Sequence, residues 1–248
     1  MQQYFINDFV GEDEIAISDK DMVNHMFNVM RLSTGDEVVL VDQNGIKYLS
    51  ELSDAKSHIF RIKKAIDENL ELPIRVSIAS GFPKGDKMSF ISQKATELGA
   101  YEIFGFPADR SVVKWNDAKL DKLMVKLQKI VKGAAEQSKR NHVPELKLFK
   151  RKNDLALIFE NFDKVIIAYE ESALGGENSV LSNVLNNIEP SQKILFVFGP
   201  EGGLSGSEID LFTSKGGICA GLGPRIMRAE TAPIYALSAV SYALELNS

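Results

Sequence analysis

Two glycine-rich stretches late in the chain combine residue types that could bind a ligand. The first, FVFGPEGGLSGSEID (residues 196–210), ends an apolar run with Gly-Pro-Glu-Gly-Gly and continues into a sequence typical of a helix start. The second, GLGPRIMRAETAPIYAL (221–237), places two arginines and a carboxylate before another helix start. Because glycines leave the backbone open to close approach, both stretches indicate binding chemistry. We call residues 199–203 the first glycine loop and residues 221–230 the second glycine loop.

Four interpretations of the first stretch compete. A P-loop requires Lys and then Ser or Thr after its last glycine, and no lysine follows these glycines. A dinucleotide fingerprint requires Gly-x-Gly-x-x-Gly, which no register supplies. A plain strand-to-helix connection explains a capping box between Ser205 and Glu208, which we predict. It does not explain a Pro-Glu pair between glycines at a strand end, where open α/β sheets bind ligands, so we predict a ligand loop.

Apolar runs and helical patterns predict the elements that position these loops. Continuous apolar strands that alternate with helices are typical of an α/β fold with a parallel sheet covered on both faces. The predicted strands are 74–82, 101–108, 164–171, 193–200 and 217–223, and the predicted helices are 86–99, 117–140, 179–187, 205–215 and 232–246. The ends of the last three strands would then form three walls of one pocket.

The first seventy residues have a different pattern, in which short strands are separated by turn residues. One short helix, 21–32, is predicted to place Met22, Met26, Val29 and Met30 on one side. This pattern predicts a small β-barrel with an inserted helix. The polar run that ends at Pro73 predicts a linker, and therefore two domains, 1–72 and 73–248.

Charge is unevenly distributed along the chain. The net charge is -5, yet residues 110–152 hold 13 Lys and Arg against four acidic residues. This asymmetry indicates a polyanionic partner at one face. Helix 117–140 carries lysines beside its apolar stripe, and a solvated helix is the better explanation of these lysines alone. Together with Lys139, Arg140 and the basic cluster 147–152, contact with an RNA backbone explains the pattern equally well. The lysines beside the stripe are Lys119, Lys122, Lys126, Lys129 and Lys132.

The sequence lacks the residue patterns of a metal site, a membrane span and a signal peptide. Cys219 is the single cysteine and the three histidines are widely spaced, so no metal site is predicted. No apolar run reaches the roughly 18 residues of a membrane span, and the first residues lack the pattern of a signal peptide. We therefore expect a cytoplasmic protein without a metal.

Taken together, the motifs resemble one enzyme family. FVFGPEGGLSGSEI and LGPRIMRAETAPIYAL resemble the SPOUT RNA methyltransferases, and more narrowly the bacterial ribosomal RNA small subunit methyltransferase E family. The resemblance continues through HMFNVMRLSTGDEV, ASGFPKGDKMSFISQKATELGA, DRSVVKW, AAEQSKRNHVP and IAYEES, so it spans both predicted domains. It implies a PUA-like RNA-binding β-barrel, then a methyltransferase domain with a deep trefoil knot, in a homodimer.

The resemblance also implies a cofactor and a substrate. The enzymes of this family transfer a methyl group from S-adenosylmethionine to N3 of the uridine conventionally numbered 1498 in 16S rRNA, and family resemblance favours the assembled small subunit as substrate. The implied cofactor site comprises Tyr169, Glu170, Gly199, Pro200, Glu201, Gly202, Leu222, Gly223, Ile226 and Met227.

Attack by the uracil N3 requires loss of its proton, hence a base or a cation that stabilises the developing anion. The candidates are Arg228 as anion stabiliser and Glu230 as the base or as the residue that orients Arg228. A salt bridge between these two residues that braces the loops is an almost equal alternative. For RNA, the resemblance points to a set of basic residues, namely Arg31, Lys84, Lys87, Arg110, Lys139 and Arg140.

Two other functions remain open at this point. One is a non-catalytic RNA-binding or ribosome-assembly factor that kept the fold. The other is a SPOUT methyltransferase that modifies tRNA or a ribose 2′-hydroxyl, because the glycine loops concern the cofactor more than the target nucleotide.

Overall fold

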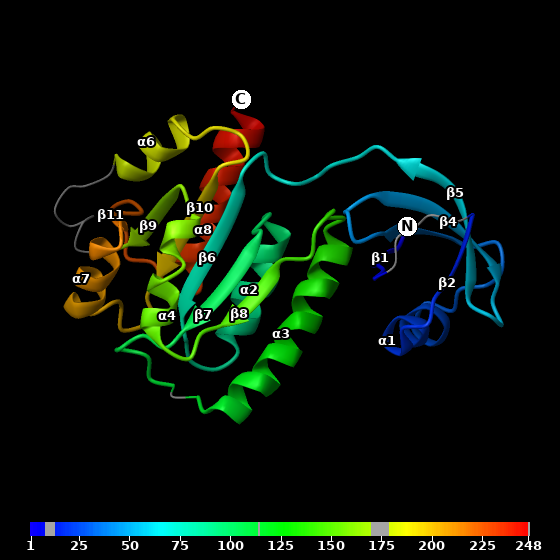
Figure 1. Cartoon of the computed structure of the whole chain (residues 1–248), viewed down its shortest axis with the longest axis horizontal. Coiled ribbons are helices and arrows are strands. Elements are labelled where there is room, and N and C mark those ends of the chain that lie inside the picture. The colour runs from blue at the N-terminus through cyan, green and yellow to red at the C-terminus, as the bar shows by residue number, and fades with distance from the viewer. Residues whose placement is uncertain (8–12, 114, 170–178, 248) are drawn as a thin grey trace. The chain divides into compact units, whose positions relative to one another are not determined.

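The computed structural model describes residues 1–7, 13–113, 115–169 and 179–247 (Figure 1). It divides into two compact units. The first unit consists of Met1–Glu71 and Ala135–Val143, and the second consists of Leu72–Ala134 and Pro144–Ser248. The first unit is therefore built from two separate segments of the chain.

The first unit holds a curled five-stranded sheet, shown in blue and cyan in Figure 1. Its strand order is β1-β3-β4-β5-β2; β1 runs parallel to β3 and the other pairs are antiparallel. The strands are β1 (Gln3–Phe5), β2 (Glu14–Ala16), β3 (Glu37–Val41), β4 (Lys47–Asp54) and β5 (Ile59–Ile66). The sheet confirms the predicted small β domain. Strand β1 was not predicted from the sequence.

One helical segment lies against this sheet. It begins as α1 (Lys20–Val23) and continues as a π-helix, Asn24–Val29. Met22 and Met26 are buried in the core with Leu40 and Phe60. Val29 is 60% exposed and Met30 37% exposed, so the prediction that all four apolar residues share the buried side is wrong. A π-helix turns less per residue than an α-helix, so the later side chains rotate away from the core.

The second unit contains a six-stranded sheet in which every neighbouring pair is parallel, which confirms the predicted α/β fold. Its strand order is β11-β9-β10-β6-β7-β8. The strands are β6 (Arg75–Gly81), β7 (Glu102–Phe106), β8 (Glu145–Leu148), β9 (Lys164–Ala168), β10 (Lys193–Phe198) and β11 (Ile218–Ala220). The edge strand β8 was not predicted, because its charged residues resemble those of a basic surface.

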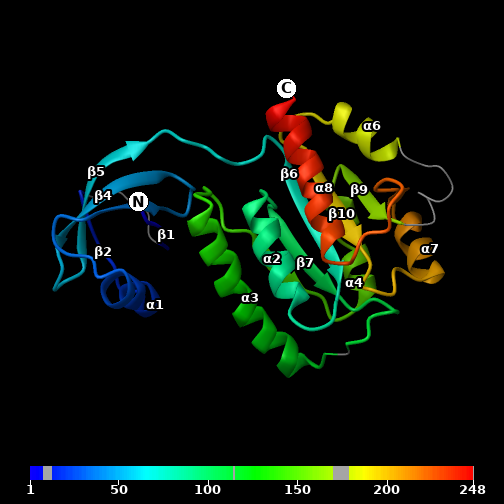
Figure 2. The same ribbon diagram turned by 180° about the vertical axis from the view of Figure 1, so that it is seen from behind.

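Helices cover both faces of this sheet. Figure 2 shows α2 (Lys87–Glu97) and α8 (Thr231–Ser241) in front of it. On the other face, α4 (Lys152–Ala156), the short 3-10 helix Phe159–Asn161 and α7 (Gly206–Ser214) pack in one apolar core with alternate strand residues. The remaining described helices are α3 (Asp117–Gln137), α6 (Val180–Asn186) and the π-helix Tyr242–Leu246, which continues α8. The trefoil knot stays a prediction.

None of the described helices combines the length and the apolar character that a membrane span requires.

Candidate functional site

A cavity of about 880 Å³ lies where three neighbouring strands of the second unit end. Strands β9, β10 and β11 lead into its walls, which are Tyr169, the first glycine loop and the second glycine loop. The backbone N–H of Tyr169 donates to the carbonyl of Ala220 at 3.1 Å, so this wall is fixed to β11. The three predicted walls therefore come together at the carboxyl edge of the sheet, where parallel sheets bind ligands.

Most of the predicted cofactor residues line this cavity. Glu170 lies outside the described residues. The lining members of the predicted set are Tyr169, Gly199, Pro200, Glu201, Gly202, Leu222, Gly223, Ile226 and Met227. Arg228, Lys87 and Arg110, which we predicted for other roles, also line it. Ile226 is 75% exposed, which leaves a large apolar side chain available to cover a ligand.

Glycine is required in the first glycine loop because the backbone folds back on itself. A Cβ atom at Gly199 would lie 2.7 Å from the carbonyl carbon of Gly203 and 2.8 Å from the nitrogen of Leu204. Gly203 has φ +71°, and its N–H donates to the carbonyl of Pro200 at 2.8 Å. The loop is thus a tight turn that only glycine permits at these positions.

The helix that follows the first glycine loop begins with the predicted capping box. Ser205 Oγ accepts from the backbone N–H of Glu208 at 3.2 Å, and Glu208 Oε2 accepts from that of Ser205 at 2.8 Å. Glu208 is fully buried, and its Oε1 accepts from the N–H of Asp109 at 2.9 Å. The capping box therefore also fixes the loop that follows β7.

We expect Ser205→Ala to lower the free energy of unfolding by about 1–2 kcal/mol, because α7 loses its side-chain cap. Denaturation in urea measures this change. Ser214→Ala, at the exposed last residue of α7, is the matched control and should stay within about 0.5 kcal/mol of the parent. Equal effects of the two substitutions would contradict a stabilising role for the cap.

Asp109 and Arg110 support the first glycine loop from its other side. Asp109 accepts from Lys152 Nζ at 2.6 Å and from Ser205 Oγ at 2.6 Å. The hydrogen bond from Lys152 and then that from Ser205 lower the pKa of the Asp109 carboxyl. Arg110 Nη1 donates to the carbonyl of Gly202 at 3.1 Å. Arg110, predicted to contact RNA, therefore also holds the first glycine loop. No sequence pattern indicates this contact or the role of Asp109, because Gly202 lies 92 residues beyond Arg110 along the chain and Ser205 lies 96 residues beyond Asp109.

Lys87 connects the two glycine loops. Its Nζ lies 2.9 Å from Glu201 Oε1 in the first glycine loop and 3.0 Å from Glu230 Oε2 in the second. The alternative prediction was a salt bridge between Glu230 and Arg228. Among the described residues, the ion-pair partner of Glu230 is Lys87 and not Arg228, so this prediction is wrong. No sequence pattern indicates that Lys87, Glu201 and Glu230 meet, because these three residues are far apart along the chain.

The carboxyl groups of Glu201 and Glu230 stay ionised near neutral pH. Burial raises the pKa of each, but the ion pair with Lys87, the backbone hydrogen bonds and the nearby charges outweigh it, so both pKa values are lowered. The ion pairs with Glu201 and then Glu230 raise the pKa of Lys87. The trio therefore consists of one cation between two anions.

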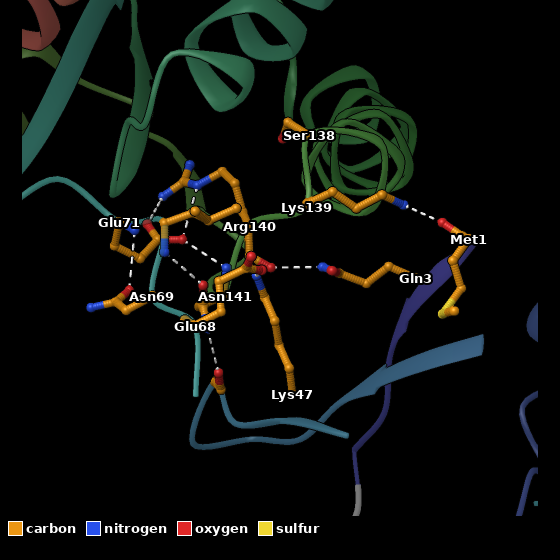
Figure 3. A network of polar contacts seen from close by, with 12 residues as sticks. Met1, Gln3, Lys47, Glu68, Asn69, Glu71, Ser138, Lys139, Arg140 and Asn141 are labelled. Atoms are coloured by element: carbon orange, nitrogen blue, oxygen red, sulfur yellow. Dashed lines mark hydrogen bonds and ion pairs between the residues drawn. The ribbon is translucent and has the colours of Figure 1, made fainter. Parts of the chain in front are cut away.

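The other predicted RNA-binding residues differ in their surroundings. Lys84 and Arg31 are exposed, and Arg31 has φ +57°. Lys139 Nζ donates to the carbonyl of Met1 at 2.8 Å (Figure 3). Arg140 is only 3% exposed, and its guanidinium forms an ion pair with Glu71. A phosphate cannot reach a guanidinium covered in this way, so we assign Arg140 a structural role.

Figure 3 shows the polar contacts that link Arg140 and Asn141 to the N-terminal segment of the first unit. The segment Ala135–Val143 lies within the first unit, where Gln3 Nε2 donates to the Arg140 carbonyl at 2.7 Å. The side-chain amide of Asn141 donates to the carbonyls of Gly45 at 2.9 Å and Glu68 at 2.8 Å. These bonds satisfy polar backbone groups on both segments of the unit.

Among the described residues, no group of three or more His, Cys, Asp or Glu side chains is placed to hold a metal ion.

Comparison with known proteins places this geometry in a family. A family model described as an RNA methyltransferase domain matches residues 70–241, and one described as an RNA methyltransferase PUA domain matches residues 17–64. The chain is 44% identical to ribosomal RNA small subunit methyltransferase E of Bacillus subtilis (strain 168), over 99% of this chain and 98% of that protein.

Two solved structures have the same fold over nearly the whole chain. The fold matches a crystal structure described only as a hypothetical protein, with a TM-score of 0.91 and 40% identity over 100% of both chains. It also matches a ribosomal RNA small subunit methyltransferase E from Neisseria gonorrhoeae bound to S-adenosyl methionine, with a TM-score of 0.81 and 26% identity over 97% of both chains. Since these similarities extend over both units and nearly the whole sequence, the chain belongs to the ribosomal RNA small subunit methyltransferase E family.

Proposed function

We propose that this protein transfers a methyl group from S-adenosylmethionine to N3 of a single uridine, position 1498 by convention, in the 16S rRNA of the small ribosomal subunit. The observation that carries the proposal is the cavity between the two glycine loops, which holds the predicted cofactor residues and the guanidinium of Arg228 together. Family membership supports the same reaction, and the Neisseria gonorrhoeae relative was crystallised with this cofactor.

The residues of the cavity fit such a cofactor. A Cβ at Gly199 or Gly202 would clash with its surroundings, so glycine at these positions keeps the first glycine loop in its tight turn. Backbone N–H and C=O groups of this loop that are not used within the turn can form hydrogen bonds with the edge of an adenine. Leu222, Ile226 and Met227 supply apolar cover for its faces. The bound cofactor would supply an activated methyl group, and the protein's task is to position the uridine and exclude water.

Arg228 and Glu230 take different roles in this proposal. Arg228 is exposed and lines the cavity, so its guanidinium can stabilise the negative charge that the uracil carries after N3 has given its proton to solvent water. Glu230 has a lowered pKa and pairs with Lys87, which makes it a weak base. We therefore favour Arg228 as the anion stabiliser and Glu230 as a residue that fixes the second glycine loop.

The RNA would be held by both units. We propose that the first unit, which is the predicted domain 1–72 with the segment Ala135–Val143 added to it, is an RNA-binding PUA-like domain, and that the second unit is the knotted methyltransferase domain. We also propose that the protein acts as a cytoplasmic homodimer on the assembled subunit. Arg31, Lys84 and Lys139 are the proposed phosphate contacts, together with Arg110. On α3, Lys126 pairs with Asp86 at 2.9 Å, an exposed contact that a phosphate can displace.

The decisive test is methyl transfer from labelled S-adenosylmethionine to small subunits purified from cells that lack this gene, followed by nucleoside mass analysis. We expect 3-methyluridine at one site. Subunits from cells that carry the gene are the control and should accept almost no label, since their site is already modified. Cofactor binding without transfer would indicate a different RNA target. Absence of cofactor binding would favour a non-catalytic assembly factor.

A further inference from the structure

We infer that Lys87 is a positioning residue that holds the two glycine loops in their binding arrangement by pairing with one carboxylate from each. This inference rests on the proposed function, because it concerns the cofactor cavity. It changes the role predicted from the sequence, in which Lys87 contacts RNA.

The geometry makes Lys87 the common partner of two separate loops. The two carboxylate oxygens lie within 3.0 Å of the same nitrogen, Glu201 after β10 and Glu230 immediately before α8. Elsewhere in the described part of the chain, no Lys or Arg forms an ion pair with either carboxylate. The side chains are 29%, 24% and 19% exposed for Lys87, Glu201 and Glu230, so water screens the trio only partly. Without the ammonium, two neighbouring carboxylates would repel each other and drive the loops apart.

The stability of helix α2 does not explain a lysine at this position. Lys87 is the first residue of α2, where a cation opposes the helix dipole. The first turn of α2 contains no acidic residue, and the side chain of Asp86 does not cap it. The favourable partners of Lys87 are therefore the carboxylates of the two loops rather than groups of its own helix.

Glu201 extends the link toward the RNA side of the site. Its Oε1 also accepts from the backbone N–H of Lys84 at 3.1 Å. One carboxylate in the first glycine loop thus fixes both ends of the segment 84–87, which carries a proposed phosphate contact. A shift of this segment on RNA binding would move the cofactor loops, and the reverse also holds because coupling between two sites is reciprocal.

The test measures cofactor affinity directly, on the full-length protein, by calorimetry with S-adenosylmethionine. We expect Lys87→Met to raise the Kd at least tenfold and Lys87→Arg, which keeps the charge, to recover most of the affinity. The matched control is Lys94→Met: Lys94 lies on the same helix and pairs with Glu97 at 2.7 Å, away from the cavity lining. The Kd of the Lys94→Met protein for S-adenosylmethionine should equal that of the parent protein.

A double-mutant cycle separates positioning from general loss of structure. Glu230→Gln should weaken cofactor binding in the parent protein and add little in the Lys87→Met background, since the pair is already broken. If Lys87→Met does not fold, Lys87→Arg and Glu230→Gln still test the link. Unchanged Kd in these variants, with weaker RNA binding for Lys87→Met, would overturn the inference and restore Lys87 as an RNA contact. If the parent protein itself does not bind S-adenosylmethionine, the proposed function fails instead.

Discussion

Replacing Arg228 by alanine is expected to lower kcat for methyl transfer by about 100- to 1,000-fold, the usual cost of losing one group that stabilises an anionic transition state. The effect should fall on kcat, because Arg228 has no place in the predicted cofactor set. The backbone carbonyl of Arg228 accepts from the N–H groups of Thr231 at 2.9 Å and Ala232 at 3.1 Å, and these bonds do not depend on the side chain. The start of α8 should therefore survive the substitution.

The measurement is single-turnover transfer to small subunits with saturating S-adenosylmethionine, accompanied by calorimetry of cofactor binding. Arg225→Ala is the comparison, since Arg225 is also exposed and lines the same cavity. A phosphate contact at Arg225 would change KM for the subunit and its salt dependence rather than kcat. Intact turnover of Arg228→Ala with bound cofactor would remove Arg228 from the chemistry.

Replacing Gly199 by alanine is expected to weaken S-adenosylmethionine binding by about 100-fold, because an opened loop would lose about two backbone hydrogen bonds to the cofactor, each worth roughly 1–1.5 kcal/mol, and about 1.4 kcal/mol is tenfold in Kd. The added Cβ would lie 2.7 Å and 2.8 Å from two backbone atoms of the same loop, Gly203 C and Leu204 N. Backbone cannot rotate aside as a side chain can, so the first glycine loop must open.

Gly206→Ala is the matched control for Gly199→Ala. No atom lies within 4 Å of a Cβ built at Gly206, which is the first residue of α7. Alanine should leave the cofactor Kd unchanged there and favour the helix. Calorimetry gives both Kd values, and urea denaturation shows whether Gly199→Ala remains folded. Equal affinities for the two variants would mean that the loop tolerates a side chain at Gly199.

Features that depend on local pattern could be predicted from the sequence. The apolar runs located the strands that carry the site, and the Ser205–Glu208 spacing identified the capping box. The helix predicted to begin at residue 232 is α8, which begins one residue earlier, at Thr231, with Glu230 as its N-cap residue. Helix ends depend on a few hydrogen bonds, which a propensity pattern locates only to within a residue or two.

Features that depend on long-range pairing could not be predicted. Lys87 and Arg140 both read as exposed cations suited to RNA, yet each has carboxylate partners from distant segments. The sequence shows that a residue is charged but not which opposite charge the fold brings to it. The same limit applies to Lys47, which is 1% exposed and pairs with Glu68 at 2.6 Å.

The two-segment construction of the first unit has a consequence for biosynthesis. A nascent chain exposes Glu71 and Gly45 well before Asn141 leaves the ribosome, and at common elongation rates the interval is on the order of several seconds. During that time water must bind three groups that residues 140–142 later bind. These groups are the Glu71 carboxylate and the carbonyls of Gly45 and Glu68. The first unit is therefore complete only after the whole of α3 has been synthesised, and a stop codon before that point would release a fragment without the partners that residues 140–142 supply.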